Sequence, residues 1–155
     1  MPVYVLRILE ENSAEDLIAK LESRIRNFYS HCLKWRWCVD DNDQGPSWRN
    51  TIIENSEFVR SILREANGSV VKDTVTGDLK DIYERAYNDA IKYLGEDTIK
   101  NKYAIYEIFN NTDNIGNVVK VRQWMVSTAK TERAIDLVNN KETIIWKIKK
   151  SNKKK

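Results

Sequence analysis

The chain has few of the residues on which most enzymes depend for acid–base, metal or phosphate chemistry. Its 155 residues include one His, two Cys and five Gly. A single His excludes a metal site with several His ligands and any mechanism that uses two histidines. The sequence also contains no Cys-x-x-Cys pair, no glycine-rich phosphate loop and no nucleophile elbow. We therefore assign no catalytic residue, no metal and no cofactor, and we expect a protein without enzymatic activity.

Long hydrophobic runs are also missing. The apolar stretch VYVLRIL near the N-terminus is too short for a membrane span or a signal peptide, and Glu10 and Glu11 follow it closely. We expect a cytoplasmic protein with no transmembrane segment. Cys32 and Cys38 fall on different faces of one predicted helix, which argues against a disulfide between them. Two small buried cysteines in a reducing compartment are the expectation.

The length and composition fit one globular domain. Hydrophobic residues make up 41% of the chain and charged residues 32%, enough for a core and a soluble surface. We expect a single domain over residues 1–150, with a helical body at about 13–95 and a β-rich part at about 102–149. A basic tail follows at 151–155.

Charge is distributed unevenly, although the formal net charge is only +3. Residues 1–116 carry 15 Lys/Arg and 20 Asp/Glu, whereas residues 117–155 carry 11 and 3. The last nine residues, KIKKSNKKK, contain six lysines and no acid. Such a tail attracts nucleic acid, an anionic membrane surface or an acidic protein. A solvated tail that only aids solubility is the alternative.

Apolar residues recur at helical spacing in three segments of the N-terminal half. They predict helices at about 13–37, 46–66 and 77–94. Gly95 can adopt the left-handed conformation that ends a helix. Because short connections favour antiparallel neighbours, we expect a three-helix bundle.

Residues after Gly95 have a different character. The stretches YAIYEIF (103–109) and VVKVRQWMV (118–126) are rich in β-branched and aromatic residues, and turn formers separate them. They predict a β-hairpin with a long turn, with a helix over 98–109 as the alternative. The remaining predicted elements are strands at 3–9 and 142–148 and a short helix at 131–139. The expected fold class is therefore α+β: an antiparallel three-helix bundle with a small antiparallel β-sheet.

Alternation along the predicted C-terminal strands places basic residues on one face of that sheet. A basic face with an aromatic residue is typical of a nucleic-acid surface. Our first hypothesis is therefore a small non-enzymatic binding protein that engages nucleic acid through this face. The predicted contact residues are Lys120, Arg122, Trp124, Lys147, Lys149 and Lys150.

The junction of the first two helices gathers tryptophans around the single His. The tryptophans either close the end of the bundle, with Arg49 covering an aromatic face, or Trp37 forms an exposed stacking and phosphate platform with Arg36 and Arg49. This Trp-rich end could also present an apolar surface to a protein partner or a second copy of the chain. Such a surface is the basis of our alternative hypothesis, a protein-interaction module such as a regulatory, antitoxin-like or viral component. A small enzyme centred on His31 is the second alternative. This candidate pocket or partner surface comprises His31, Trp35, Trp37, Trp48 and Arg49.

Three stretches carry a resemblance to a known family: LESRIRNFYSHCLKWRW, SWRNTIIENSEFVRSILREANGS and DIYERAYNDAIKYL. Over about residues 21–95 the chain resembles an uncharacterised prokaryotic helical family, domain of unknown function twenty-nine. The resemblance implies a helical bundle and no known activity. It also implies that His31, Trp35, Trp48 and Arg49 cluster where the first two helices meet. The chain departs from the family pattern at Ser56, where a basic residue is usual. The matching residues are Leu21, Glu22, Ser23, Arg24, His31, Leu33, Lys34, Trp35, Ser47, Trp48, Arg49, Thr51, Ile52, Ala86, Tyr87, Asp89 and Ala90.

Overall fold

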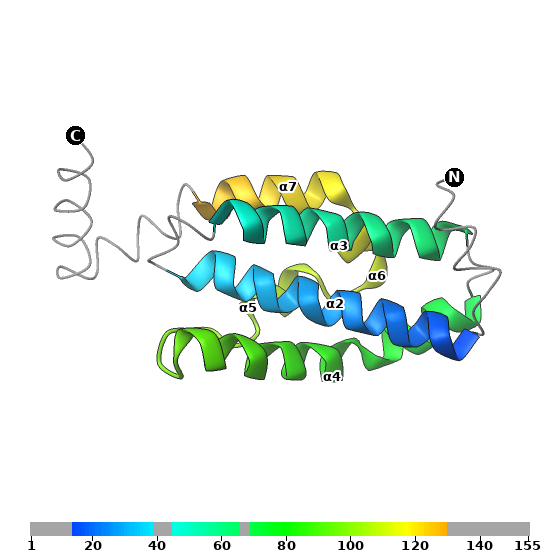
Figure 1. The fold of residues 1–155 in the computed structure, drawn as a ribbon, viewed down its shortest axis with the longest axis horizontal. Helices are drawn as coiled ribbons and strands as arrows, with labels where there is room; N and C mark the ends of the chain where they lie inside the picture. The colour runs from blue at the N-terminus through cyan, green and yellow to red at the C-terminus, as the bar shows by residue number, and fades with distance from the viewer. Residues whose placement is uncertain (1–13, 39–44, 66–68, 130–155) are drawn as a thin grey trace, which may run out of the picture.

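The computed structural model describes residues 14–38, 45–65 and 69–129, and every regular element in these ranges is a helix. Helix α2 lies between α3 and α4, α7 packs on α3, and the short helices α5 and α6 cross behind α2 in the view of Figure 1. The bounds are α2 (Ala14–Trp37), α3 (Gly45–Glu65), α4 (Ser69–Leu94), α5 (Ala104–Ile108), α6 (Thr112–Gly116) and α7 (Val118–Ser127).

Helix α2 forms where the sequence predicted it because both its terminal charges and the spacing of its apolar residues favour a helix there. Glu15 and Asp16 lie in its first turn, and Lys34 and Arg36 lie in its last, so the side chains complement the helix dipole. Apolar residues at helical spacing supply a buried stripe. The buried members of this stripe are Leu17, Leu21, Ile25, Phe28, Tyr29, Cys32, Leu33 and Trp37.

Tyrosine hydroxyls attach the segment after Gly95 to the three long helices. The Tyr29 hydroxyl of α2 donates to the carbonyl of Phe109, and the Tyr83 hydroxyl of α4 donates to the carbonyl of Lys102. The two rings pack edge to face with centroids 5.0 Å apart. Burial raises the pKa of Tyr29, so its hydroxyl stays protonated and remains a donor.

The predicted β-hairpin is wrong, and with it the α+β fold class. Residues 103–109 contain α5 and residues 118–126 lie in α7, and there is no strand anywhere in the described ranges. The alternative of a helix over 98–109 is closer to the structure, although α5 covers only five of those residues. The β-branched and aromatic content misled the prediction because tertiary packing overrides intrinsic propensity.

The spacing in α7 explains this correction. Its buried residues, Val121, Trp124 and Met125, follow the three-and-four spacing of a helix. The side chain of Asn117 accepts a hydrogen bond from the backbone N–H of Lys120 at 3.0 Å, which caps the first turn. An alternating pattern would have buried residues two apart, and the structure shows no such set in this segment.

Helices α2, α3 and α4 confirm the three predicted helices of the body. Helix α4 begins at Ser69, two turns before the predicted start near Gly77, because Val71, Val75 and Leu79 already supply a buried stripe four residues apart. Gly95 ends the helix with φ +99°, as predicted. The predicted strands at 3–9 and 142–148 and the helix at 131–139 lie outside the described residues.

Two smaller expectations also have structural outcomes. Cys32 and Cys38 are both buried and are not joined by a disulfide, which confirms the packing predicted for them. None of the helices described is long and apolar enough to cross a membrane.

We predict that Ser56→Ala stabilises the fold. Ser56 of α3 is fully buried, and its hydroxyl has no hydrogen-bond partner among the described residues. Because an unsatisfied buried hydroxyl is unfavourable, removing it should raise the free energy of unfolding by about 1 kcal/mol in a urea titration. Ser61→Ala on the half-buried side of the same helix controls for helix propensity. An equal gain from both variants would contradict the prediction.

We further predict that stability falls as pH rises from about 4.5 to about 7 because of Glu22. Desolvation, a hydrogen bond to Asp78 of α4 and repulsion by that carboxylate raise the pKa of Glu22 from 4.5 to about 7. The folded state therefore holds a proton that the unfolded state releases in this pH window, and stability decreases as that proton is lost.

Glu22→Gln should remove this dependence and raise the free energy of unfolding at pH 8. The expected gain is about 1 kcal/mol, since the carboxyl is partly exposed and solvent screens it. Urea titrations at pH 5 and pH 8 measure it, with Glu54→Gln on the exposed side of α3 as the matched control. A pH slope that persists unchanged in Glu22→Gln would refute the assignment.

Candidate functional site

A groove of about 620 Å³ lies on the side of α2 that faces away from the buried stripe. Helix α2 supplies its floor, and Asp89 of α4 contributes to one edge. The residues that line the groove are Ser23, Arg24, Arg26, Asn27, Ser30, His31, Lys34 and Asp89.

Helical spacing brings the polar groove residues together. Asn27, His31 and Lys34 are four and three residues apart, so they lie on one face of α2. The apolar residues Ile25 and Cys32 occupy the opposite face and are buried in the core. The packing of the core therefore determines which side chains the groove receives.

The edge toward α4 is closed by an ion pair. The Arg26 guanidinium donates to both carboxylate oxygens of Asp89, with Nε–Oδ2 at 2.7 Å and Nη2–Oδ1 at 2.9 Å. The guanidinium lowers the pKa of Asp89 below its ordinary value. The pair is bidentate, so Arg26 is neutralised within the groove.

The other two cations of the groove lie over aromatic rings. The Arg24 guanidinium is 4.7 Å from the Phe58 ring centroid of α3, and the Lys34 ammonium is 4.8 Å from that of Tyr93 in α4. Neither cation has an ion-pair partner among the side chains that the structure describes. Cation–π contact fixes the position of a cation without neutralising it. The groove therefore keeps a net positive charge.

His31 presents a hydrogen-bond acceptor to the groove. Its Nδ1 lies 2.9 Å from the backbone carbonyl oxygen of Asn27. A carbonyl only accepts, so Nδ1 carries the proton and Nε2 of the neutral ring keeps its lone pair. Burial lowers the pKa of His31 from its ordinary value, which favours the neutral form. The adjacent Cys32 is buried and its thiol pKa is raised well above its ordinary value, so it is not a candidate nucleophile.

Tyr93 adds an exposed aromatic ring beside Lys34. It is 56% exposed, although its ring packs edge to face on Trp48 with centroids 5.7 Å apart. Trp48 is itself only 5% exposed and therefore acts as a support for Tyr93. One end of the groove thus combines a cation with a fixed, accessible ring.

The residues predicted around the Trp-rich junction have different environments. His31 lines the groove, Trp35 packs against the core, and Trp37 is buried. The guanidinium of Arg36, not that of Arg49, covers the Trp37 ring at 5.1 Å. Arg49 is exposed. The tryptophans therefore close this end of the bundle, while His31 lines the groove and Trp48 supports the ring of Tyr93.

The basic residues predicted on a C-terminal sheet face are not arranged as expected. Lys120, Arg122 and Trp124 belong to α7, where two-residue spacing places Arg122 on a different side of the helix from the other two. Trp124 is buried and packs edge to face on Phe109, with centroids 5.4 Å apart. The other predicted contacts, Lys147, Lys149 and Lys150, lie outside the described residues.

Sequence reasoning missed most of the groove. Arg24, Lys34 and Asp89 were noted only as matching positions of a family pattern, and Tyr93 was not noted at all. The groove could have been predicted from the polar residues that recur three and four apart on the exposed side of α2. The part played by Tyr93 depends on its contact with Lys34 across two helices, which spacing along one helix does not reveal.

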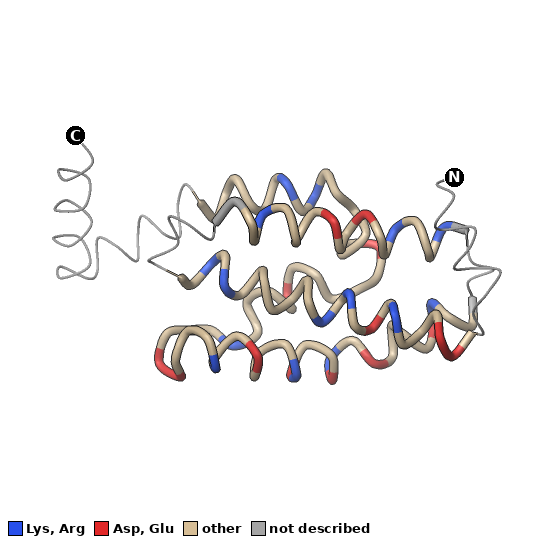
Figure 2. The backbone as a smooth tube through the Cα atoms, in the orientation of Figure 1, with Lys and Arg blue, Asp and Glu red and all other residues tan. Residues whose placement is uncertain are grey.

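Figure 2 shows how charge is placed on the fold. Acidic residues are frequent along α4, whereas Lys120 and Arg122 are the charged residues of α7. The described residues up to 116 carry 14 Lys/Arg and 15 Asp/Glu, so this part of the helical body is nearly neutral. The positive groove is therefore a local feature of α2.

Comparison with known proteins identifies a family. Residues 10–112 match the family described as Domain of unknown function DUF29. No curated protein and no solved structure matches the chain. The matched range covers more than half of the chain and contains all the groove residues and Tyr93. The chain therefore belongs to the DUF29 family.

Proposed function

We propose that the protein is a non-enzymatic binding module that holds single-stranded nucleic acid along the α2 groove. The observation that carries this proposal is the placement of Lys34 beside the exposed ring of Tyr93, at one end of a groove with unpaired positive charge. Single strands are bound by basic grooves that follow the phosphates, together with aromatic rings on which bases stack. The groove offers both features.

The cations are spaced for more than one phosphate. Arg24 and Lys34 are ten residues apart on α2, which is about 15 Å along a helix axis. This length exceeds the distance between neighbouring phosphates of a single strand, so the two cations can contact different phosphates of one ligand. Because the aromatic rings already fix both cations, little side-chain entropy would be lost on binding.

The uncharged groove residues suit the remainder of a nucleotide. Ser23 and Asn27 supply donors and acceptors, and Nε2 of His31 accepts a hydrogen bond. A ribose hydroxyl or an exocyclic amine of a base is a suitable donor to that nitrogen. These side chains complement the phosphate contacts without providing a nucleophile.

The proposed nucleic-acid site is on α2 and not on the C-terminal face that the sequence predicted. Helix α7, with Lys120 and Arg122, lies on the far side of α3 from α2 in Figure 1, and its aromatic residue is buried. The lysines at 147, 149 and 150 remain predicted polyanion contacts that would add electrostatic affinity.

We predict that Lys34→Gln weakens binding of a labelled single-stranded oligonucleotide about tenfold at low salt. The plot of log K against log salt concentration should also become shallower by about 0.7, the amount expected for one lost phosphate contact. Fluorescence anisotropy over a salt series measures both values. Arg122→Gln removes one exposed charge from α7 and is the matched control. An equal or greater loss with Arg122→Gln would overturn the location proposed here.

We also predict that Tyr93→Ala weakens binding by about 1–2 kcal/mol, whereas Tyr93→Phe retains it. Stacking requires the ring and not the hydroxyl, so the two substitutions should differ. The same anisotropy assay measures the difference, with thermal unfolding to verify that both variants are folded. Unchanged affinity in a folded Tyr93→Ala variant would remove stacking from the proposal.

A further inference from the structure

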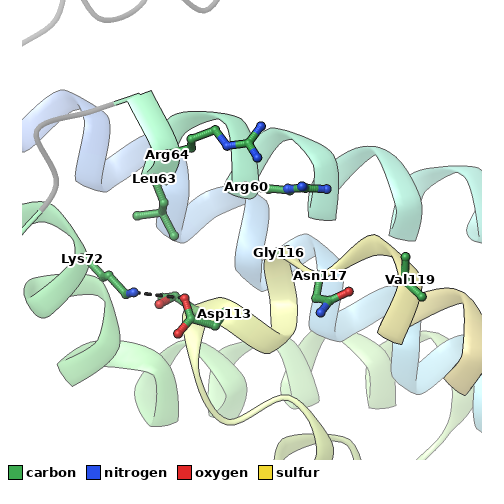
Figure 3. Close-up of a pocket in the computed structure, with 9 residues that line it drawn as sticks. Arg60, Leu63, Arg64, Lys72, Asp113, Gly116, Asn117 and Val119 are labelled. Atoms are coloured by element: carbon green, nitrogen blue, oxygen red, sulfur yellow. Dashed lines mark hydrogen bonds and ion pairs between the residues drawn. The ribbon is translucent and has the colours of Figure 1, made fainter. Parts of the chain in front are cut away.

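We propose a second binding site, independent of the α2 groove: the pocket between α3, α4, α6 and the start of α7 binds the phosphate monoester group of a small molecule through Arg60 and Arg64. The pocket has a volume of about 470 Å³, within the range of small-molecule sites. Figure 3 shows Arg60 and Arg64 along α3, with Lys72 and Asp113 toward one end of the pocket and Asn117 and Val119 toward the other.

The two arginines are unpaired. They lie four residues apart on α3, both are exposed, and neither forms an ion pair with any side chain that the structure describes. Glu57, one turn before Arg60, also forms no ion pair with a side chain in the described ranges. Like charges at this spacing repel weakly. A bound dianion would relieve this repulsion, and guanidinium groups fit phosphate oxygens with two parallel hydrogen bonds.

The third cation of the pocket is already partnered. The Lys72 ammonium lies 3.0 Å from Oδ1 of Asp113. The pocket therefore contains three cations and one carboxylate, a net excess of two positive charges. This excess matches the dianion of a phosphate monoester more closely than the single charge of a diester.

Close packing of α6 on α3 forms the pocket wall. Gly116 lies directly against the backbone of Arg60: a Cβ at this position would be in van der Waals contact with the Cα of Arg60, at 3.4 Å. The Oδ1 atom of Asn117 is occupied in capping α7, whereas the two arginines are the pocket cations without an ion-pair partner among the described side chains. Leu63 and Val119, the latter 65% exposed, provide an apolar flank for the organic part.

Arg64 could instead have a purely structural role, and the variants distinguish this possibility from ligand binding. Arg64 lies in the last turn of α3, where a cation stabilises the helix dipole without any ligand. Arg60 is one turn further from that end and does not share this explanation. Variants at both positions therefore separate ligand binding from helix stabilisation.

The test is titration calorimetry of the full chain with phenyl phosphate at low salt. Arg60→Gln and Arg64→Gln should each weaken binding at least about fivefold. Asp113→Asn should tighten it about threefold, because it removes the one carboxylate among the described residues that line the pocket and frees Lys72. Arg49→Gln, which removes an exposed charge from the other end of α3, should have little effect. Thermal unfolding verifies that each variant is folded.

Two comparisons complete the experiment. Dimethyl phosphate, a diester with one charge, should bind at least about tenfold more weakly than phenyl phosphate. Lys34→Gln should leave phenyl phosphate binding unchanged, so that failure of this site and failure of the α2 groove are distinguishable. Undetectable phenyl phosphate binding, equal losses with Arg60→Gln and Arg49→Gln, or equal affinity for the two phosphates would overturn the proposal.

Discussion

The rotation of α2 about its own axis is the constraint on which the rest of the structure depends. Ile25, Phe28 and Cys32 are fully buried, and a turn of the helix in either direction would expose them to water. Burying side chains of the size of Ile25 and Phe28 contributes about 1.5–3 kcal/mol each. With that face fixed against α3 and α4, Asn27, His31 and Lys34 must face outward. The groove is therefore a consequence of the core and requires no separate stabilisation.

Two buried tyrosines fix the segment after Gly95 to the long helices. Tyr29 and Tyr83 are fully buried, and each donates its hydroxyl to a backbone carbonyl of that segment. Buried hydroxyls need partners, and these two find them in a stretch without regular structure on either side of α5. These two contacts also position the chain that continues into α6 and α7. Helix α6 packs on α3, where Gly116 lies against Arg60. The pocket beside Arg60 thus depends on contacts far from it.

Helical spacing was enough to predict the three long helices, because each carries a continuous buried stripe. It was not enough for α7, since Lys120 and Arg122 alternate with Val119 and Val121 and so imitate a strand. Only the capping by Asn117 and the spacing of Val121, Trp124 and Met125 distinguish the helix. Most of the groove was equally hidden. Lys34 and Tyr93 are 59 residues apart in the sequence, and their contact exists only after α2 and α4 have packed.

A cation that is already in an ion pair is less available to an anionic ligand than one that is not. Arg26 is held by Asp89, whereas Arg24 and Lys34 rest on rings and keep their charge for a ligand. The most direct measurement of the central claim is an amide chemical-shift map of the labelled protein with a short single-stranded oligonucleotide. The account predicts that the largest changes fall between Ser23 and Lys34 of α2 and at Asp89 and Tyr93 of α4. Changes concentrated on α7 with α2 unaffected would contradict it.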